Sequence, residues 1–410
     1  MTGGSRVTFA IIVIPDSQEL ARRAEWNQYY SMMADWIVAQ KSDLNIQAVL
    51  HVGDITNDNT VAQWEVASAA LNQIKAAGIP FIPCRGNHDN IAGYNQYFGY
   101  GTFQEFASVG KYSDTDARNY YVELEVEGEP YLIFSVDFGP NDEVMEWVSS
   151  EIHDHPAHHV MLVTHSYMYP DGTHVSPDDP GNPKLSYGPS ANTGEEMWTE
   201  YLQQHPNVEG VFSGHHLQDR NYAHRLDFNA RNRAVFQAFQ NWQNVVCGGN
   251  GRVCVYQITP HTDPAAGDGR YGLTLNVYDT VLGQYLPEYD LQVKYGAILP
   301  WLMGDMRQFS RSRFSRPGTQ VRQVSVDIAE ATANATRMFT AAPRFVEVEI
   351  RGGALDAQAY LAAAPSYLVA GARRFGLIQF SAPGTLQSRP VSIDGAAVTL
   401  AATRDPLGAA

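Results

Sequence analysis

Apolar and polar positions alternate in a regular order along the first 295 residues. Short apolar runs with the length and composition of buried strands lie at 7–14, 46–52, 79–83, 159–164 and 208–213. After the first run, apolar residues recur every three or four positions from Trp26 to Ile37, which predicts a helix. Further helices are expected around 60–77, near 141–152 and near 194–204.

The remainder of this region is predicted to be rich in strands. Residues 120–126 and 131–136, separated by Glu127-Gly128-Glu129-Pro130, have the pattern of a β-hairpin. Three more strands are expected at 234–239, 252–258 and 273–278. Because strands alternate with helices over short connections, we expect a layered α/β core in which helices cover the faces of the sheets.

Each of the five apolar runs ends in side chains that can bind a metal ion. In chain order these are Asp16 and Gln18, then Asp54 and Asn57, then Asn87, His88 and Asp89, then His165, and last His215 and His216. In layered α/β proteins, ligands gather at the carboxyl ends of the strands, where all of these residues are expected. Packing alone does not explain this coincidence, so the pattern predicts a metalloenzyme.

These residues also fall into five motifs in a fixed order. Asp16-x-Gln18, Gly53-Asp54-x-x-Asn57, Gly86-Asn87-His88-Asp89, Thr164-His165 and Gly214-His215 resemble, in order and spacing, the motif set of calcineurin-like metallophosphoesterases. The resemblance covers about residues 5–280. It implies an α/β fold, a four-layer α/β sandwich with a two-metal site.

The resemblance also implies a role for each residue. The implied ligands are Asp16 and Gln18 for a first ion, Asp54 as a bridge between two ions, and Asn87, His165 and His215 for the second ion. His88, oriented by Asp89, would stabilise or protonate the departing oxygen. The implied cofactors are two divalent metal ions, with Mn²⁺ preferred and iron, zinc or magnesium as alternatives.

Two positions depart from the family's usual pattern. Gln18 stands where the family usually has His, and Leu217 stands where the second His of Gly-His-x-His would be. The first ion would then be bound by oxygen atoms alone, which suits Mn²⁺, Mg²⁺ or Ca²⁺ better than Zn²⁺ and predicts a weaker site. His216 could bind instead, but adjacent strand residues point to opposite faces, so we do not expect it to.

The remaining histidines and cysteines have simpler interpretations. His51 lies inside a buried strand and is expected to be a hydrogen-bonded core residue. The histidines at 153–159 lie in a connection that contains Pro156, so a solvated loop is preferred to a metal site. Three cysteines are too few for a disulfide framework. Cys247 and Cys254 flank a hairpin-like Gly-Gly-Asn-Gly sequence, where two reduced cysteines are preferred to a local disulfide.

The connection at 167–192 is rich in Pro and Gly and has neither a helical nor a strand period. Because it starts two residues after His165, it is expected to overhang the metal site, and loops of this length are often functional. Tyr167, Tyr169 and His174 would then shape the substrate pocket. The alternative is that this connection is a disordered surface loop without a function.

Charge divides the chain into two parts. Residues 296–410 contain 12 Arg, no Lys and 8 acidic residues, a net charge of +4, whereas the first 295 residues contain 16 basic and 36 acidic residues, a net charge of −20. We therefore expect a metallophosphoesterase-like catalytic domain at 1–295 and, at 296–410, an Arg-containing arm with a small β-rich domain. The arm is expected to dock on the acidic part or on a neighbouring subunit, so the C-terminal domain would serve assembly or formation of a homo-oligomer.

These features predict a metal-dependent phosphoesterase that hydrolyses a phosphomonoester or phosphodiester by attack of a metal-bound hydroxide. The alternative is a non-catalytic binding or structural subunit of a larger assembly that retains the fold. A small phosphoester is the expected partner, and the acidic charge argues against long nucleic acid. The sequence has no run of 18 uncharged apolar residues and no signal-peptide pattern, so no membrane partner is expected and the predicted location is cytoplasmic.

Overall fold

The computed structural model describes residues 7–103, 106, 108–218, 220–231, 233–260 and 271–295, together with strands β15 to β23 between 319 and 403. The chain divides into two compact units, Met1–Arg307 and Gln308–Ala410. The assignment of a catalytic domain to 1–295 and an assembly domain to 296–410 stays a prediction. The Arg-containing arm at 306–318 lies outside the described residues.

Sheet A of the first unit has seven strands, three of which end at candidate ligands. Its order is β13-β12-β11-β1-β2-β3, and β14 also pairs with β12. The strands are β1 (Phe9–Ile14), β2 (Ile46–His51), β3 (Phe81–Pro83), β11 (Val253–Pro260), β12 (Tyr271–Asp279), β13 (Gln284–Tyr285) and β14 (Leu291–Tyr295). Since β1, β2 and β3 run parallel, Asp16, Asp54 and Asn87 follow them at the same edge of the sheet.

Sheet B also has seven strands, in the order β4-β5-β6-β7-β8-β10-β9. They are β4 (Ser108–Lys111), β5 (Tyr120–Val126), β6 (Glu129–Ser135), β7 (His159–Val163), β8 (Val208–Ser213), β9 (Tyr222–Phe228) and β10 (Ala234–Gln240). The central strands β6, β7, β8 and β10 run parallel. His165 and His215 therefore follow neighbouring strands at one edge of sheet B.

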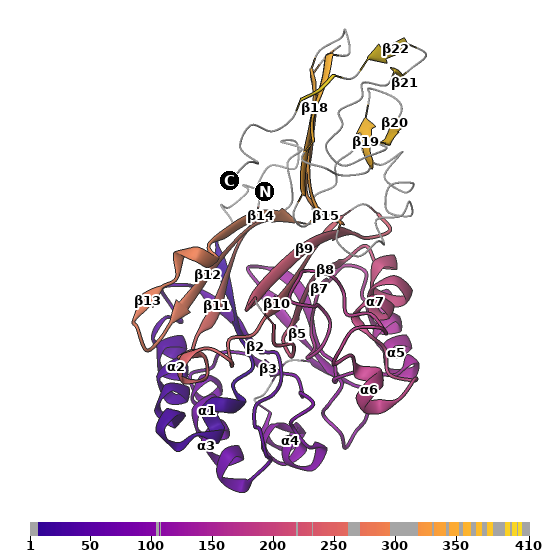
Figure 1. Ribbon diagram of the computed structural model, residues 1–410. Coiled ribbons are helices and arrows are strands. Elements are labelled where there is room, and N and C mark those ends of the chain that lie inside the picture. The colour runs from indigo at the N-terminus through magenta and orange to yellow at the C-terminus, as the bar shows by residue number, and fades with distance from the viewer. Residues whose placement is uncertain are drawn as a thin grey trace. The chain divides into compact units, whose positions relative to one another are not determined.

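Helices lie on the outer faces of both sheets (Figure 1). They are α1 (Gln18–Arg22), α2 (Asn27–Ala39), α3 (Val61–Ala76), α4 (Ile91–Phe98), α5 (Asp142–Asp154), α6 (Pro183–Tyr187), α7 (Gly194–Glu196) and α8 (Val246–Gly249). A π-helical turn, Met197–Tyr201, continues α7, and short 3₁₀ helices span Ala24–Trp26, Tyr100–Thr102, Leu202–Gln204 and Pro287–Tyr289. Among the described residues, none of these helices has both the length and the apolar character to cross a bilayer.

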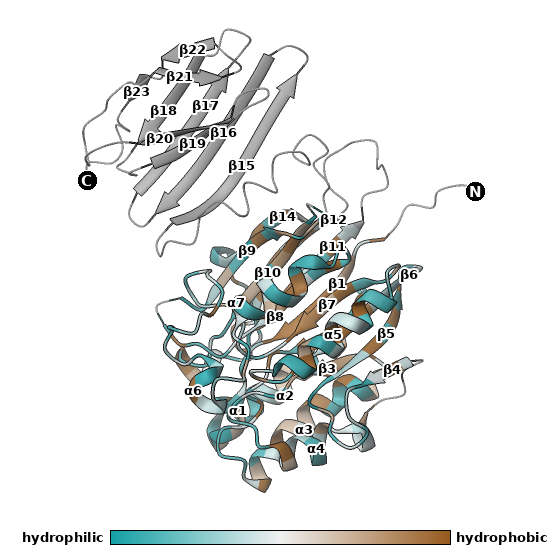
Figure 2. Ribbon diagram, turned by 90° about the vertical axis from the view of Figure 1, so that its right-hand side faces the viewer, coloured by the Kyte–Doolittle hydropathy of each residue, from teal (hydrophilic) through white to brown (hydrophobic). Residues whose placement is uncertain are grey.

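Three hydrophobic clusters hold the first unit together as four layers. The cluster between the sheets combines side chains of both, including Val13, Ile133, Phe212 and Tyr256. A second cluster joins the outer face of sheet A to α2, α3 and α4, and a third joins the outer face of sheet B to α5 and the helical segment after α7. In Figure 2 the strands between the helices are mainly hydrophobic. The predicted four-layer α/β sandwich is confirmed.

Local sequence explains how the helices begin. Thr60 and Asn141 cap α3 and α5, and their side chains accept hydrogen bonds from the backbone N–H groups of Gln63 and Val144. Asp142, in the first turn of α5, carries a negative charge that the helix dipole favours there. The predicted helices at 60–77 and 141–152 are confirmed within two residues at each end.

The described residues of the second unit form strands. A five-stranded sheet has the order β15-β16-β17-β18-β23, and β19–β20 and β21–β22 form two-stranded pairs. The strands are β15 (Thr319–Ala329), β16 (Thr332–Ala341), β17 (Arg344–Arg351), β18 (Asp356–Leu361), β19 (Ser366–Ala370), β20 (Phe375–Gln379), β21 (Pro390–Ile393), β22 (Ala396–Thr399) and β23 (Ala401–Thr403). The region is β-rich.

One local prediction about the cysteines is wrong. Cys247 and Cys254 do not flank a hairpin turn, because Cys247 belongs to the short helix α8, whereas Cys254 lies in β11. The Gly248-Gly249 pair supplies two successive residues with positive φ, which lets the chain turn tightly before β11. Both cysteines are free, in agreement with the preferred reduced state.

Candidate metal centre

Two glycines allow close approaches at the strand ends, Gly86 between neighbouring strands of sheet A and Gly53 between the two sheets. A Cβ atom on Gly86 would lie 2.2 Å from both the backbone nitrogen and Oδ1 of Asp54. A Cβ atom on Gly53 would lie 2.8 Å from His165 Nδ1, and Gly53 also has a φ of +96°. Asp54 and His215 themselves have φ values of 52° and 78°, in the left-handed region that costs free energy in residues with a side chain. Such strain is concentrated at functional sites.

Four side chains meet around His165 Nε2. This atom lies 3.2 Å from Asp54 Oδ1, 3.0 Å from Asn87 Oδ1 and 3.1 Å from His215 Nδ1. The ligand atoms of Asp54, His165 and His215 all lie within 4.8 Å of one another. We call Asp54, Asn87, His165 and His215 the imidazole site. The structure therefore brings together the four residues that were predicted to bind the second ion.

Backbone carbonyl groups fix the tautomers of both imidazoles. His165 Nδ1 lies 2.7 Å from the carbonyl oxygen of Val52, and His215 Nε2 lies 3.0 Å from that of Gly181. Because a carbonyl oxygen only accepts hydrogen bonds, these two ring nitrogens carry the protons. In the neutral rings His165 Nε2 and His215 Nδ1 are then lone-pair donors. These two lone-pair nitrogens face each other, and the Oδ1 atoms of Asp54 and Asn87 lie beside them. The arrangement fits a divalent cation.

The pKa values in the imidazole site reflect the same crowding of acceptors. Burial opposes the charged form of His165, but the carboxylates of Asp54 and Asp16 outweigh this effect and raise its pKa to about 9. Burial and the neighbouring His165 lower the pKa of His215 to about 4. A cation at this position would compete with the proton on His165, as metal ions do at protein ligands.

Asp16 lies beside the imidazole site, after β1, and Gln18 follows it as the first residue of α1. We call Asp16, Gln18 and Asp54 the oxygen site. Both carboxylate oxygens of Asp16 accept from the backbone N–H of His215, at 3.1 and 3.2 Å, and burial raises the pKa of Asp16 well above its usual range. Gln18 is buried, and its Oε1 has no hydrogen-bond partner among the described residues. An unpartnered buried oxygen calls for an explanation, and a cation ligand is one.

His216 does not turn toward the oxygen site. Its Nε2 lies 3.2 Å from Ser166 Oγ, and its ring packs on Tyr169 with centroids 4.6 Å apart. Leu217 is half-exposed. The donors that the structure offers to a first ion at Asp16, Gln18 and Asp54 are therefore oxygen atoms.

Asn241 belongs to the centre, although sequence reasoning missed it. Its Nδ2 donates to Asp16 Oδ2 over 2.8 Å and to the carbonyl oxygen of His215 over 3.2 Å. Asn241 follows β10, which is parallel to β8. The signal was the same as at the other five positions, a polar residue directly after an apolar run.

The expectation that Asp89 orients His88 is wrong. Asp89 is buried, and its carboxylate accepts from the backbone N–H groups of Ile55 (3.0 Å), Thr56 (2.8 Å) and Gly86 (3.1 Å). The Thr56 hydroxyl also donates to Asp89 Oδ1, over 3.1 Å, and these four hydrogen bonds join the loop after β2 to the loop after β3. His88 Nδ1 instead lies 3.1 Å from the carbonyl oxygen of Asn57. The His88 ring is therefore oriented by a backbone carbonyl, and its backbone N–H donates to Asp54 Oδ1 over 3.0 Å.

Two further histidine predictions have different outcomes. His51 is a satisfied core residue, as expected, because its Nε2 lies 2.8 Å from Ser17 Oγ and its Nδ1 accepts from Gly53 N. His159 was grouped with a solvated loop, which is wrong. It is buried in β7, and its Nδ1 lies 2.8 Å from Glu209 Oε1.

The long connection reaches the metal centre, since Gly181 supplies the carbonyl oxygen beside His215. Tyr167 and His174, two of the residues expected to shape a substrate pocket, instead form hydrogen bonds with Gln237. The Tyr167 hydroxyl donates to Gln237 Oε1 over 2.6 Å, and His174 Nε2 lies 2.7 Å from the same oxygen. Both side chains are buried against sheet B and hold the connection in place, so they do not line a pocket.

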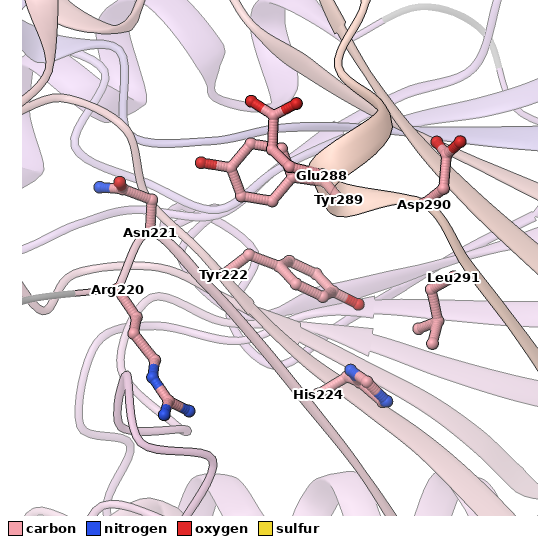
Figure 3. Close-up of a pocket in the computed structure, with 8 residues that line it drawn as sticks. All are labelled: Arg220, Asn221, Tyr222, His224, Glu288, Tyr289, Asp290 and Leu291. Atoms are coloured by element: carbon pink, nitrogen blue, oxygen red, sulfur yellow. The ribbon is translucent and has the colours of Figure 1, made fainter. Parts of the chain in front are cut away.

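A cavity of about 390 Å³ lies between β9 and the 3₁₀ helix before β14. Figure 3 shows the rings of Tyr222 and Tyr289 within it. The carboxylates of Glu288 and Asp290 point away from the Tyr222 ring in this view. Because these charged groups do not converge on one point, we assign no cation site to this cavity.

The sequence matches the family model described as Calcineurin-like phosphoesterase over residues 9–219, just over half of the chain. The chain belongs to the calcineurin-like phosphoesterase family. All eight predicted site residues lie inside the matched segment, whereas Asn241 lies outside it. The match ends shortly after β8, before β9 and β10 complete sheet B.

Among curated proteins, the chain is similar to the Uncharacterized protein YvnB of Bacillus subtilis. The two are 26% identical over 266 residues, which cover 62% of this chain and 19% of YvnB. The chain thus spans about a fifth of the length of that relative.

Solved structures with a similar arrangement include purple acid phosphatase PPD1 from yellow lupin (Lupinus luteus) seeds and the NAD nucleotidase NadN of Haemophilus influenzae. The lupin enzyme is 13% identical, with a TM-score of 0.43 over 70% of this chain and 54% of that chain. NadN is also 13% identical, with a TM-score of 0.39 over 68% of this chain and 53% of that chain. GAP50, described as the anchor in the inner membrane complex of Plasmodium, is 11% identical, with a TM-score of 0.42 over 71% of this chain and 89% of that chain.

Proposed function

We propose that this protein is a metal-dependent hydrolase of phosphomonoesters or phosphodiesters. The observation that carries the proposal is the imidazole site, where His215 Nδ1 and the Oδ1 atoms of Asp54 and Asn87 lie 3.0–3.2 Å from His165 Nε2. Without a metal ion, a proton on His165 Nε2 would have to take its place among these buried acceptors, as the raised pKa of His165 indicates. Membership of the phosphoesterase family supports the same reaction class.

The imidazole site would hold one ion tightly, and the oxygen site would hold a second ion more weakly. The mixed nitrogen and oxygen donors of the imidazole site suit Mn²⁺, iron or zinc. The oxygen donors of the oxygen site suit Mn²⁺ or Mg²⁺. Mn²⁺ is therefore the ion that fits both sites. When bound, divalent ions would lower the pKa of water and stabilise negative charge on the phosphoryl oxygens.

His88 would act on the departing oxygen of the substrate. The Asn57 carbonyl holds the Nδ1 side of the ring, so Nε2 is the nitrogen available to give a proton to a leaving group. His88 is partly exposed, whereas its neighbour Asp89 is buried. Its backbone bond to Asp54 keeps the ring next to the metal ligands.

A non-catalytic binding subunit is the second candidate, and Leu217 is the observation that favours it. The half-exposed Leu217 occupies the position where the family's usual motif has a metal-binding His. A chain that has lost its first ion would keep the fold and the imidazole site but lose turnover.

The remaining assignments are proposals about the whole protein. A small phosphoester is the proposed substrate, and long nucleic acid and membranes are not proposed as partners. The positively charged region at 296–410 would serve assembly or a homo-oligomer, and a cytoplasmic location stays a prediction. None of these depends on the identity of the metal.

A panel of p-nitrophenyl phosphomonoesters and phosphodiesters tests the proposed function. Each substrate should be assayed with metal-free protein and after addition of Mn²⁺, Mg²⁺, Zn²⁺ or Fe²⁺. The expected result is hydrolysis of at least one ester class, strongest with Mn²⁺ and absent from the Asp54→Asn variant. If no ester is hydrolysed with any ion while the protein binds metal, the non-catalytic candidate is correct.

A further inference from the structure

A second cavity, of about 430 Å³, lies next to the metal centre. Its wall includes Tyr112, Arg118, Phe138, Asn141, Tyr187 and Ser190. These residues come from the loop before β5, the loop after β6 and the end of α6. A volume of a few hundred Å³ is typical of sites for small organic ligands.

Phe138 forms a wall shared by the cavity and the metal centre. Its ring centroid lies 5.6 Å from that of His165 and 5.0 Å from that of His215. On its other side it packs on Tyr187, at 5.4 Å. A phosphoester whose phosphoryl group is at the metal centre could therefore place its organic group in this cavity.

Among the described residues that line the cavity, none carries an unpaired positive charge with which to hold an anion. Arg118 lines it, but the guanidinium group lies 2.6 Å from Asp116 Oδ2 and 3.0 Å from Asp137 Oδ2. Asp137 is in turn paired with Arg85 at 2.7 Å. Asp116 and Asp137 also line the cavity, and because both are paired with arginines, the lining offers no free charge that would attract a carboxylate or second phosphate on the substrate.

Two tyrosines give the cavity an aromatic character. Tyr112 is 39% exposed and packs on Trp147 with ring centroids 5.7 Å apart. Tyr187 is 45% exposed and packs on Phe138. Each ring is thus fixed by an aromatic neighbour and still accessible, so it can stack against a ring of a ligand. Asn141 and Ser190 add polar groups to the same wall.

We propose that this cavity binds the organic group of the phosphoester and selects a flat, uncharged ring that carries hydrogen-bonding groups. The proposal rests on the proposed function and names the substrate class of the same site. Tyr112 is the specificity-determining residue that can be tested best, because its side chain is half-exposed and is not placed among the metal ligands. Phosphoesters with an anionic organic group are expected to bind this cavity more weakly.

The test compares three monoesters of primary alcohols, whose leaving groups are similar: adenosine 5′-monophosphate, glycerol 3-phosphate and 3-phosphoglycerate. If only diesters react, their methyl diesters replace them. We expect kcat/KM to be highest for the adenosine ester and lowest for the anionic phosphoglycerate, with at least a tenfold difference between these two. Equal values for all three esters would overturn the proposal while leaving the phosphoesterase function intact.

The Tyr112→Ala variant tests the residue directly. Loss of one stacking partner should lower kcat/KM for the adenosine ester by about 5- to 20-fold, through KM, and leave glycerol 3-phosphate within about twofold. Tyr112→Trp, which keeps a ring, should retain the preference. Tyr285→Ala is the matched control, because Tyr285 is 43% exposed and lies on β13, away from the cavity lining. Equal losses for all esters in Tyr112→Ala, or the same loss in Tyr285→Ala, would contradict the assignment.

Binding of adenosine itself separates the two proposals. Adenosine has no phosphate, so calorimetry with the whole protein reports on the cavity even if no ester is hydrolysed. We expect wild-type protein and Tyr285→Ala to bind adenosine and Tyr112→Ala to bind at least fivefold more weakly. Absence of binding to the wild type would overturn the proposal for the cavity, whereas binding without hydrolysis would overturn only the proposed function.

Discussion

His165 Nδ1 lies 2.7 Å from the carbonyl oxygen of Val52, so a strand end of sheet A fixes a ring that extends from sheet B. This single contact determines the tautomer of the central ligand, because the carbonyl can only accept the Nδ1 proton. The metal-binding form of His165 therefore depends on the two sheets being packed together. A structure in which the sheets separate would lose the site even with every ligand still present.

The His88→Ala variant should lower turnover by about 10²- to 10⁴-fold, the usual range for a positioned acid–base group. Metal content should hardly change, since the ring of His88 contacts the Asn57 carbonyl and is not assigned to the ligands. The measurement is kcat for a series of aryl phosphoesters, with metal content determined on the same samples. The loss should shrink for leaving groups of low pKa, which need no proton. Equal losses across the series would remove His88 from this role.

The Asp89→Ala variant should behave differently from His88→Ala. Removal of the carboxylate leaves buried N–H groups of Ile55, Thr56 and Gly86 without an acceptor. We expect the free energy of unfolding to fall by about 2–4 kcal/mol, measured in chelator so that bound metal does not contribute. Asp35→Ala, at an exposed position of α2, is the matched control and should change stability by less than about 0.5 kcal/mol. A stable Asp89→Ala protein with a loss of proton transfer alone would restore the original idea that Asp89 orients His88.

Much of the centre follows from one rule, that ligands gather after parallel strands. Asp54, Asn87, His165 and His215 each come directly after an apolar run, and the structure brings these four together. The rule works because side chains at the carboxyl ends of parallel strands lie at the same edge of the sheet, whichever conformation the loops adopt. The four-layer arrangement follows from the same alternation of strands and helices.

The parts that could not be predicted depend on backbone groups and on strand order. The carbonyl oxygens of Val52, Asn57 and Gly181 carry no signal in the sequence, yet each determines how an imidazole is held. Asn241 also follows an apolar run, but its contact with Asp16 depends on the pairing of β10 with β8, and the order of strands in a sheet is not given by the residue pattern. Asp89 was assigned to the wrong partner because adjacency in the chain says nothing about where its side chain points.

Stability should fall with acidification in part because of His174. Burial, with the nearby Arg225, lowers the pKa of this histidine to about 3, while Asp227 and Gln237 face it and act in the opposite sense. In the unfolded chain the pKa is near 6.5, so the unfolded state binds the extra proton first, and stability is lost as the pH falls from about 6.5 toward 3. The His174→Gln variant cannot take up that proton.

Chemical denaturation at pH 7 and pH 5 checks this prediction. The fall in unfolding free energy between the two pH values should be about 2 kcal/mol smaller in His174→Gln than in the wild type. Both proteins should be measured in chelator, which removes any contribution from bound metal. An equal fall in both proteins would show that His174 is protonated to the same extent in the folded and unfolded states.

A chain that ends at Arg307 should keep its metal and most of its activity on small phosphoesters. All predicted site residues and both seven-stranded sheets lie within the first unit. We expect the oligomeric state, measured by light scattering, or the thermal stability to change, since residues 296–410 carry a charge of +4 against −20 in the remainder. Loss of turnover in a folded, metal-loaded truncated chain would assign the C-terminal region to the active site.

Metal stoichiometry measured together with turnover tests the central claim most directly. Purified protein should be dialysed, analysed for metals, stripped with chelator and titrated with Mn²⁺ while hydrolysis of a p-nitrophenyl ester is followed. The account predicts nearer one ion than two per chain after dialysis, no turnover in the stripped protein and recovery on addition of Mn²⁺, with the tight ion absent from His165→Ala. Two stoichiometric zinc ions that survive dialysis, or turnover that persists after chelation, would contradict it.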